Sequence, residues 1–205
     1  MINNRKEESN STVISGRVLE ELEFNHSTFG ENFYSTKLAV KRSSGVFDTI
    51  PIIISERVTN INFVKMDSFV QITGEFRSHN TQEHRLDLFV FAKKIKLLDT
   101  ETYENQIVLL GYFCRQPEYR KTPLGREIAD VILAVNRPTY NKSDYIPLIF
   151  WGRTAEYVSN FNVGEKIKIH GRIQSRNYSK NKEDGSVEER IAYEVSSSIF
   201  NECVE

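Results

Sequence analysis

Polar and apolar residues alternate along many short stretches of the chain, with the two-residue period of strands that bury one face. Between residues 166 and 170, the polar Lys166 and Lys168 alternate with the apolar Ile167 and Ile169, which predicts a half-buried strand. The same pattern predicts further strands over residues 107–113, 127–135, 145–151 and 190–195. This half of the chain is therefore predicted to consist mainly of strands.

One short helix interrupts these predicted strands, over residues 153–160, with Ala155 and Val158 turned inward. Three strands, a short helix and two further strands form the element order of the five-stranded OB barrel, which closes its sheet. Pro51 and Pro147 fall inside strand patterns. Because proline has no N–H to donate to a ladder, both should lie at an edge or a bulge.

The two halves of the chain are related. At an offset of 95 residues, Gly16 falls on Gly111 and Gly30 on Gly125. The matches continue in order until residues 74–80 fall on residues 171–177, and the offset grows only to 97. This regularity indicates a duplicated domain, so the sequence predicts an all-β chain of two tandem OB barrels, each with a short helix between its third and fourth strands.

The duplication also sets the predicted domain boundaries. Residues 1–12 are polar, without the apolar segment of a secretory signal, and are predicted to form a disordered arm. The predicted parts that follow are OB domain 1 over residues 13–98, a polar linker over 99–105, OB domain 2 over 106–200 and a short C-terminal end over 201–205.

Composition narrows the class of protein. The 205 residues carry a formal net charge of −1, so any binding to nucleic acid must come from a local patch. Apolar runs such as residues 50–54 and 146–151 are far too short to span a membrane. The chain has two cysteines, Cys114 and Cys203, far apart in the sequence, which favours a reducing cytoplasm over a disulfide framework.

Sequence patterns for catalysis or metal binding are missing. The chain has no glycine-rich lysine loop and no His-Glu-x-x-His motif, and its four histidines are too scattered to suggest a metal site. The sequence therefore predicts a protein that is not an enzyme, with no cofactor, no metal and no small-molecule substrate.

The two repeats differ on the outward faces of their third and fourth strands. On the fourth strand of repeat two the outward positions are Lys166, Lys168, His170, Arg172, Gln174 and Arg176. The matching positions of repeat one are Phe69, Gln71, Thr73, Glu75, Arg77 and His79. On the third strand, Tyr145 and Trp151 of repeat two fall on Thr49 and Ser55. Cations and aromatic rings are therefore predicted to gather on the second copy.

Aromatic rings interleaved with cations favour the binding of single-stranded nucleic acid. Bases stack on such rings at about 1–3 kcal/mol per base. Lysine and arginine neutralise phosphates, which makes affinity fall as salt rises. Each residue also has an ordinary interpretation: Tyr145 and Trp151 as packing residues, Tyr140 as a loop anchor, and the cations as a solvated face. The combination of rings and cations, which repeat one lacks, favours the binding interpretation.

The sequence thus yields a set of predicted site residues. Those predicted to stack on bases are Tyr140, Tyr145, Trp151 and Tyr178. Those predicted to bind phosphates are Arg137, Lys142, Lys166, Lys168, Arg172, Arg176 and Lys180. Repeat one is expected to serve assembly, by pairing barrels through Ile53 and Phe69, which are apolar at outward positions.

Five short segments of repeat two follow one another in a recognisable order. They are residues 116–125, 133–137, 151–156, 171–178 and 193–195. In order and spacing they resemble the Asp-Pro-Glu-x-Arg, Ala-Val-Asn-Arg, Trp-Gly-x-x-Ala-Glu, Gly-Arg-Leu and Tyr-x-x-Glu-Val motifs of the bacterial single-stranded DNA-binding protein family. The resemblance covers about residues 106–197.

The resemblance implies a function and roles for individual residues. It implies binding of single-stranded DNA without strong sequence preference, in DNA replication, recombination or repair, by a cytoplasmic, nucleoid-associated protein. Tyr145 and Trp151 match the family's two third-strand aromatics, and Tyr178 matches the aromatic after its fourth strand. Tyr140 is a looser match to the aromatic in the loop between the second and third strands.

The chain departs from this family in two respects. It stops at Glu205 without the acidic, Asp-Ile-Pro-Phe-like tip through which the family recruits replication and repair proteins, and in this it is more similar to primosomal OB proteins. Most family members carry one barrel per chain and form tetramers. Two barrels in one chain therefore imply a homodimer that holds four barrels.

Two other functions stay open. A primosome-like module that mainly binds other proteins would show weak affinity for single strands and a shallow salt dependence. A single-stranded RNA binder would use the same stacking platforms, because these do not read the 2′-hydroxyl unless a specific partner is placed there.

Overall fold

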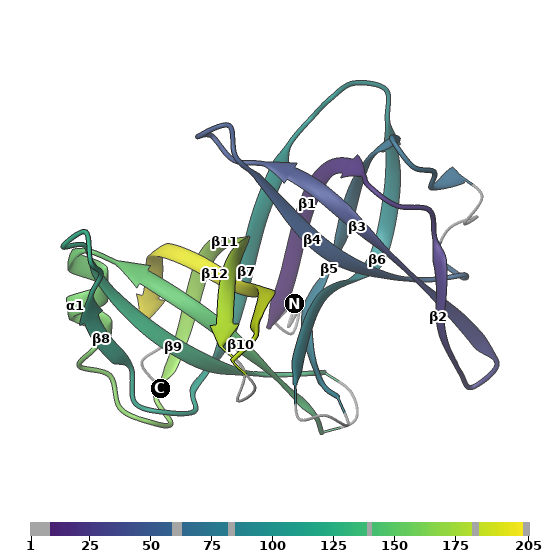
Figure 1. The fold of residues 1–205 in the computed structure, drawn as a ribbon. Helices are drawn as coiled ribbons and strands as arrows, with labels where there is room; N and C mark the ends of the chain where they lie inside the picture. The colour runs from purple at the N-terminus through teal and green to yellow at the C-terminus, as the bar shows by residue number, and fades with distance from the viewer. Residues whose placement is uncertain (1–8, 59–62, 82–84, 139–140, 182–184, 203–205) are drawn as a thin grey trace.

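The computed structural model describes residues 9–58, 63–81, 85–138, 141–181 and 185–202, without the side chains of residues 198–202. Within these residues the chain forms two β-barrels that lie side by side, with β1 and β7 between them (Figure 1). None of the described helices is long and apolar enough to cross a membrane.

The first barrel is built from the N-terminal half of the chain. Its strands are β1 (Asn10–Val18), β2 (Glu23–Thr28), β3 (Glu31–Lys41), β4 (Phe47–Ser55), β5 (Phe69–Asn80) and β6 (Leu86–Leu98). Five of them close the barrel, because β3 pairs with β4 on one side and with β1 on the other. Strand β2 pairs only with β3 and forms an outer edge.

The second barrel repeats this plan. Its elements are β7 (Glu104–Phe113), β8 (Glu118–Lys121), β9 (Glu127–Asn136), β10 (Ser143–Trp151), α1 (Arg153–Val158), β11 (Lys166–Asn181) and β12 (Val187–Glu202). Pairing of β7 with β9 closes it, and β8 forms the outer edge. One pair of strands in each barrel is parallel. Strand β4 runs parallel to β6, with Ile52 opposite Val90, and β10 runs parallel to β12, with Leu148 opposite Val195.

The predicted all-β chain of two tandem OB barrels is confirmed, with two differences in detail. Each barrel has an additional edge strand, β2 or β8, which the alternation pattern did not predict. In barrel one this strand turns into β3 through Phe29 and Gly30, whose φ angles of 49° and 72° suit a two-residue hairpin loop. Helix α1 is found in barrel two; the matching stretch of barrel one includes residues 59–62, which lie outside the described residues.

The two barrels are joined by their first strands. Strands β1 and β7 pair antiparallel from Asn10 opposite Leu109 to Ser15 opposite Glu104. Within this ladder Thr12 lies opposite Ile107, which is its own equivalent at the repeat offset of 95. The ladder therefore carries an approximate two-fold axis that relates one barrel to the other.

An asparagine makes the same hydrogen bonds in both barrels, and it is buried in barrel one and part-buried in barrel two. Asn10 Nδ2 donates to the carbonyl oxygen of Phe76 at 2.7 Å, and the Phe76 N–H donates back to Asn10 Oδ1 at 3.0 Å. Asn105 makes the same pair of bonds with Ile173, at 2.7 and 2.9 Å. Because buried backbone groups need partners, the duplication has kept this amide at both positions.

In each barrel, an aspartate paired with an arginine also accepts a backbone N–H of the other barrel. In barrel one, Arg42 Nε donates to Asp48 Oδ2 at 2.8 Å, and Asp48 Oδ1 accepts the N–H of Ser175 on β11 at 2.6 Å. The mirror arrangement lies in barrel two. There Arg137 Nε donates to Asp144 Oδ2 at 2.9 Å, and Asp144 Oδ1 accepts the N–H of Ser78 on β5 at 2.7 Å.

We call these two clusters, Arg42–Asp48–Ser175 and Arg137–Asp144–Ser78, the inter-barrel clamps. The carboxylates of Asp48 and Asp144 are almost completely buried. Because a buried charge is tolerated only when it is paired and hydrogen-bonded, the clamps hold the barrels in one relative orientation.

The prolines lie where a strand has no ladder on one side. Pro51 and Pro147 pair with β3 and β9, but the parallel ladders to β6 and β12 begin one residue later, at Ile52 and Leu148. This agrees with their predicted edge-like environment. Beside Pro147 the surface is hollowed into a cleft.

Candidate nucleic-acid interface

A cleft with a volume of about 790 Å³ lies between the two barrels, close to several of the predicted site residues. One wall is the β11–β12 hairpin of barrel two, with Tyr178, Lys180 and Arg190. The other wall is the start of β6 in barrel one, with Leu86 and its neighbours. Both barrels therefore contribute to one cleft.

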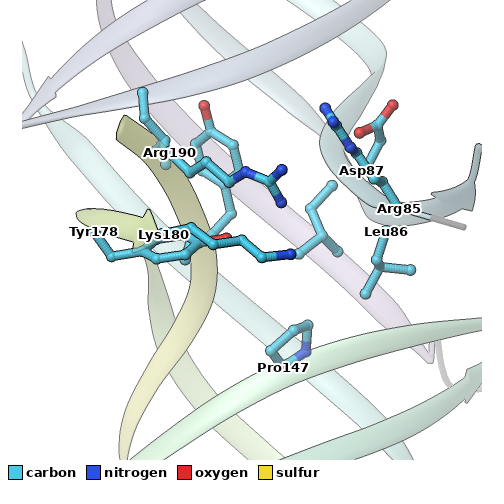
Figure 2. Close-up of a pocket in the computed structure, with 11 residues that line it drawn as sticks. Arg85, Leu86, Asp87, Pro147, Tyr178, Lys180 and Arg190 are labelled. Carbon is cyan, nitrogen blue, oxygen red and sulfur yellow. The ribbon is translucent and has the colours of Figure 1, made fainter. Parts of the chain in front are cut away.

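Figure 2 shows how these side chains lie. Lys180 and Arg190 extend from the hairpin toward Leu86 and Asp87, and Pro147 of β10 lies on a third side. Arg190 Nη2 donates to Glu188 at 2.8 Å, while its buried Nε has no hydrogen-bond partner among the described residues. The cleft thus has a cationic side with one N–H donor that has no partner among the residues that the structure describes.

The hairpin that carries this wall extends beyond the barrel. From Arg176 to Asn181, β11 pairs only with β12, and its side chains are exposed. Tyr178 lies in this stretch with 36% of its surface exposed, and the Arg176 guanidinium is 6.0 Å from the centre of its ring. Such a ring, accessible and flanked by cations, is suited to stacking on a base.

Tyr145, Pro147 and Trp151 share the outward face of β10, because side chains alternate along a strand. Tyr145 is 45% exposed, and its backbone N–H donates to Ser78 Oγ of barrel one at 2.8 Å. The part-buried Trp151 donates its indole N–H to Ser196 Oγ on β12 at 3.1 Å. The outward face of β10 therefore carries two predicted stacking residues, on either side of a proline that lines the cleft.

Two of the predicted phosphate-binding residues lie beside the aspartates of the inter-barrel clamps. Arg137 belongs to an inter-barrel clamp: it pairs with Asp144 and also donates from Nη2 to the Ser78 carbonyl oxygen at 3.1 Å. The hydrogen bond to Asp144 raises the pKa of Arg137. Arg172 Nη1 lies 3.8 Å from Asp48 Oδ2 in the other clamp. Burial lowers the pKa of Arg172, and the neighbouring charge of Arg42 lowers it further.

These contacts give Arg137 and Arg172 partners within the protein, and their role as phosphate ligands stays a prediction. Alternation along the fourth strand predicted that Arg172 points outward from barrel two, whereas Arg137 was predicted at the start of a loop. The outward face at this place is covered by barrel one, which supplies Asp48 and Ser78. A single repeat, considered by itself, carries no signal of that contact.

Lys166 and Lys168 lie at the opposite end of β11. Their part of the strand pairs with β7, and Lys166 Nζ is 5.7 Å from the centre of the Tyr112 ring. Twelve residues at about 3.3 Å per residue place Lys168 roughly 40 Å along the strand from Lys180. The structure therefore brings Arg176 and Lys180 to Tyr178, and keeps Lys166 and Lys168 away from them.

The remaining predicted residues that the structure describes lie beside a turn or in barrel one. Lys142 is exposed beside the β9–β10 turn, where its carbonyl oxygen accepts the N–H of Arg137 at 2.8 Å. Tyr140 lies outside the described residues. In barrel one, Phe69 packs edge-on against Tyr103, with ring centres 5.8 Å apart. Ile53 lines smaller clefts that continue from the large one.

Sequence reasoning missed the contribution of barrel one to this site. Leu86, Asp87 and Arg85 line the cleft, yet their repeat was expected to serve assembly. Arg190 was also missed, although its strand was predicted. Its position opposite Tyr178 follows from the hairpin register, which the sequence pattern does not specify. Among the described residues, no group of three or more His, Cys, Asp or Glu side chains could hold a metal ion.

Comparison with known proteins identifies the family of the chain. Residues 104–200 match the single-strand binding protein family. Over 83 residues the chain is 41% identical to single-stranded DNA-binding protein 3 of Listeria innocua, which covers 38% of this chain and 52% of that protein. Over 100 residues it is 38% identical to the single-stranded DNA-binding protein of Clostridium tetani, which covers 44% of this chain and 68% of that protein. The chain belongs to the single-strand binding protein family.

The family match covers the second barrel, and the alignment spans only about half the length of the Listeria protein. A solved structure extends the comparison to both barrels. The wild-type single-stranded DNA binding protein from Thermus aquaticus matches this family member with a TM-score of 0.77 at 18% identity. The match covers 96% of this chain and 93% of that chain, so the two share the tandem-barrel fold.

Proposed function

We propose that this chain binds single-stranded DNA without strong sequence preference, as a non-catalytic protein of DNA replication, recombination or repair. Bases would stack on Tyr145, Trp151 and Tyr178, and phosphates would pair with Arg176, Lys180 and Arg190. Membership of the single-strand binding protein family supports the class of ligand.

The observation that carries the proposal is the cleft beside Pro147. Tyr178 of the β11–β12 hairpin and Pro147 of β10 line it, and Lys180 and Arg190 extend toward its interior. The exposed Tyr145 lies two residues from Pro147, on the same face of β10. Stacking surfaces next to cations are what a single strand requires, because rings hold bases of any identity and cations hold the backbone. A duplex would instead require an element that fits a groove.

We further propose that the chain acts in the cytoplasm at the nucleoid, as a homodimer that brings four barrels together. Two barrels per chain, in a family whose members combine several barrels, support this assembly. Light scattering should give a mass twice that of the chain, and a monomer mass would contradict it.

The decisive experiment uses the single tryptophan. Trp151 fluorescence is followed while oligo-dT is added, at two salt concentrations. Strong quenching is expected because a stacked base covers the indole. Affinity should fall steeply with salt, since displaced counterions give a slope of about −0.7 per phosphate contact on single strands.

Each other outcome has a definite meaning. Absence of both quenching and binding in a label-free assay would favour a protein-interaction module. Binding without quenching would keep the function and remove Trp151 from the site. Tighter binding of oligo-U than of oligo-dT would assign the chain to RNA.

A further inference from the structure

The cleft between the barrels does not end at β6. A second cleft of about 250 Å³ shares Leu86, Leu88 and Tyr193 with it, and continues along β6 to Phe89. A third, of about 450 Å³, shares Phe89, Asn25 and Ile53 with the second and reaches Phe91. Together the second and third clefts form a groove that is lined mainly by barrel one, with Ile191, Tyr193 and Arg137 contributed by barrel two. We call it the β6 groove.

The β6 groove has aromatic rings at positions where barrel two has none. Phe91 lies opposite Ile53 in the β4–β6 ladder, and Ser196 lies opposite Ile149 in the matching β10–β12 ladder. By the same correspondence Phe89 matches Glu194. Barrel two has its aromatics one strand away, at Tyr145 and Trp151 on β10, where barrel one has Thr49 and Ser55. Each barrel thus has aromatic rings, on neighbouring strands.

The rings of the groove are arranged with planar polar groups. Arg77 lies over the Phe91 ring, with its guanidinium carbon 3.9 Å from the ring centre. The His26 ring stacks on Phe33 at 4.6 Å between centres, with the two planes 8° apart. Phe89 is half-buried beside them. Phenyl, imidazole and guanidinium planes are the side-chain surfaces on which unpaired bases stack.

The charge of the groove also suits a phosphate backbone. Arg77 and Arg137 line its far end, and their carboxylate partners Glu75 and Asp144 are buried, with side-chain exposures of 6% and 2%. Asp87 is the carboxylate that lines it among the described residues. An incoming chain therefore meets the arginines before it meets their partners.

We propose that the β6 groove is a second binding site for single-stranded nucleic acid, continuous with the site on barrel two. The strand passes from Tyr178 through the large cleft and along β6, where bases stack on Phe89 and on the Arg77–Phe91 pair. From Leu86 to Phe91 this adds about 16 Å of path. The inference rests on the proposed function of barrel two and goes beyond it, because it assigns binding residues to the barrel that was expected to serve assembly.

The test compares two ligands and two variants of the full chain. The ligands are oligo-dT of about 6 nucleotides, within the range that one OB fold takes, and of about 30, which exceeds it. Phe89→Ala removes a stacking ring. Asn25→Glu places a negative charge at an exposed position of the groove without disturbing the core. Matched controls are Phe63→Ala, an exposed phenylalanine of the same barrel, and Thr28→Glu, on the same strand as Asn25.

For the long oligonucleotide, each groove variant should lose on the order of fivefold or more in affinity, and the controls should not. For the short oligonucleotide, both variants should quench Trp151 as the unchanged chain does. Equal affinity of the variants and the unchanged chain for the long ligand would overturn the inference and leave the proposed function intact. Failure of the unchanged chain to bind either ligand would overturn the proposed function itself. Because Asn25 is exposed, its variant remains informative even if Phe89→Ala lowers stability.

Discussion

The two barrels share one scaffold and differ on their outward faces. Barrel two carries Tyr145 and Trp151 on β10, whereas barrel one carries Phe89 and Phe91 on β6. Side chains that bind the backbone follow the opposite rule, because Asn10 and Asn105 make the same hydrogen bonds in both copies. The comparison teaches that a side chain which supplies the hydrogen-bond partners of a backbone peptide is the same in both copies, because an unpaired buried group is costly, while the outward faces differ.

The clamps are the largest effect that this comparison predicts. Asp144→Ala should lower the free energy of unfolding by about 3–5 kcal/mol, since it leaves the Arg137 guanidinium without its buried partner. Asp48→Ala should cost at least as much, because Asp48 faces both Arg42 and Arg172. Urea unfolding followed by circular dichroism measures both. Asp99→Ala, an exposed carboxylate of the linker, is the control, and equal midpoints for all three would rule out a structural role for the clamps.

The stacking residues of barrel two should give the next largest effect, on affinity. Alanine at Tyr145 or Tyr178 should weaken binding of oligo-dT by about 1–3 kcal/mol, because each removes one stacking surface. Thr49→Ala, at the position of barrel one that matches Tyr145, should change little. Fluorescence anisotropy of a labelled oligonucleotide measures all three. A loss for Thr49→Ala equal to that for Tyr145→Ala would contradict the different placement of aromatics in the two barrels.

The asparagines should give similar, smaller losses of stability in both barrels. Asn10→Ala and Asn105→Ala each leave one backbone N–H and one carbonyl group without their partner, at about 1–2 kcal/mol. The exposed Asn80→Ala serves as the reference. In thermal unfolding, both asparagine variants should have a lower midpoint temperature than this reference. If only one of the two asparagine variants lost stability, the matching hydrogen bonds would not be equivalent in energy.

The smallest predicted effect is a pH dependence of stability that comes from Glu75 of barrel one, since the equivalent residue of barrel two is Arg172. Burial by itself raises the pKa of Glu75, but hydrogen bonds from Lys93 and Arg77 outweigh it, so the pKa lies below the ordinary 4.5. A lowered folded-state pKa gives stability that is present above the unfolded-state value and is lost as pH falls through the folded-state value. Glu75→Gln should therefore flatten the loss of stability on acidification. Equal slopes for the unchanged chain and Glu75→Gln would contradict the prediction.

Much of the fold could be predicted because its signals are local. The alternation of Lys166, Ile167, Lys168 and Ile169 marks a strand, and the repeat of glycines 95 residues apart marks a duplication. The edge strands β2 and β8 were missed, since their residues are exposed and carry no alternation of burial. Their signal was the turn: Gly30 and Gly125 both have positive φ angles, which favours glycine in a tight hairpin.

The site was only partly accessible to sequence reasoning. Tyr178 and Lys180 do line a cleft, which agrees with their predicted place on the surface. Arg137 was predicted to bind phosphate as a cation at the start of the loop between the second and third predicted strands. Its commitment to Asp144 and Ser78 depends on a strand of the other barrel, 59 residues away in the chain. Matching charged residues at positions 42 and 137, and at 48 and 144, were the available sign of a shared structural role.

The sequence by itself determined the two barrels, their order and the face of β10 that carries the aromatics, because hydrophobic periodicity and a repeat are properties of neighbouring residues. Only the tertiary structure decided which outward positions stay exposed. The antiparallel pairing of β1 with β7 brings β5 against β10 and β11 against β4, so that outward faces of one barrel become covered by the other. The same contact places Leu86 of barrel one opposite Lys180 of barrel two and creates the cleft between them. Such contacts depend on the distance between surfaces in space, which no pattern along a single chain encodes.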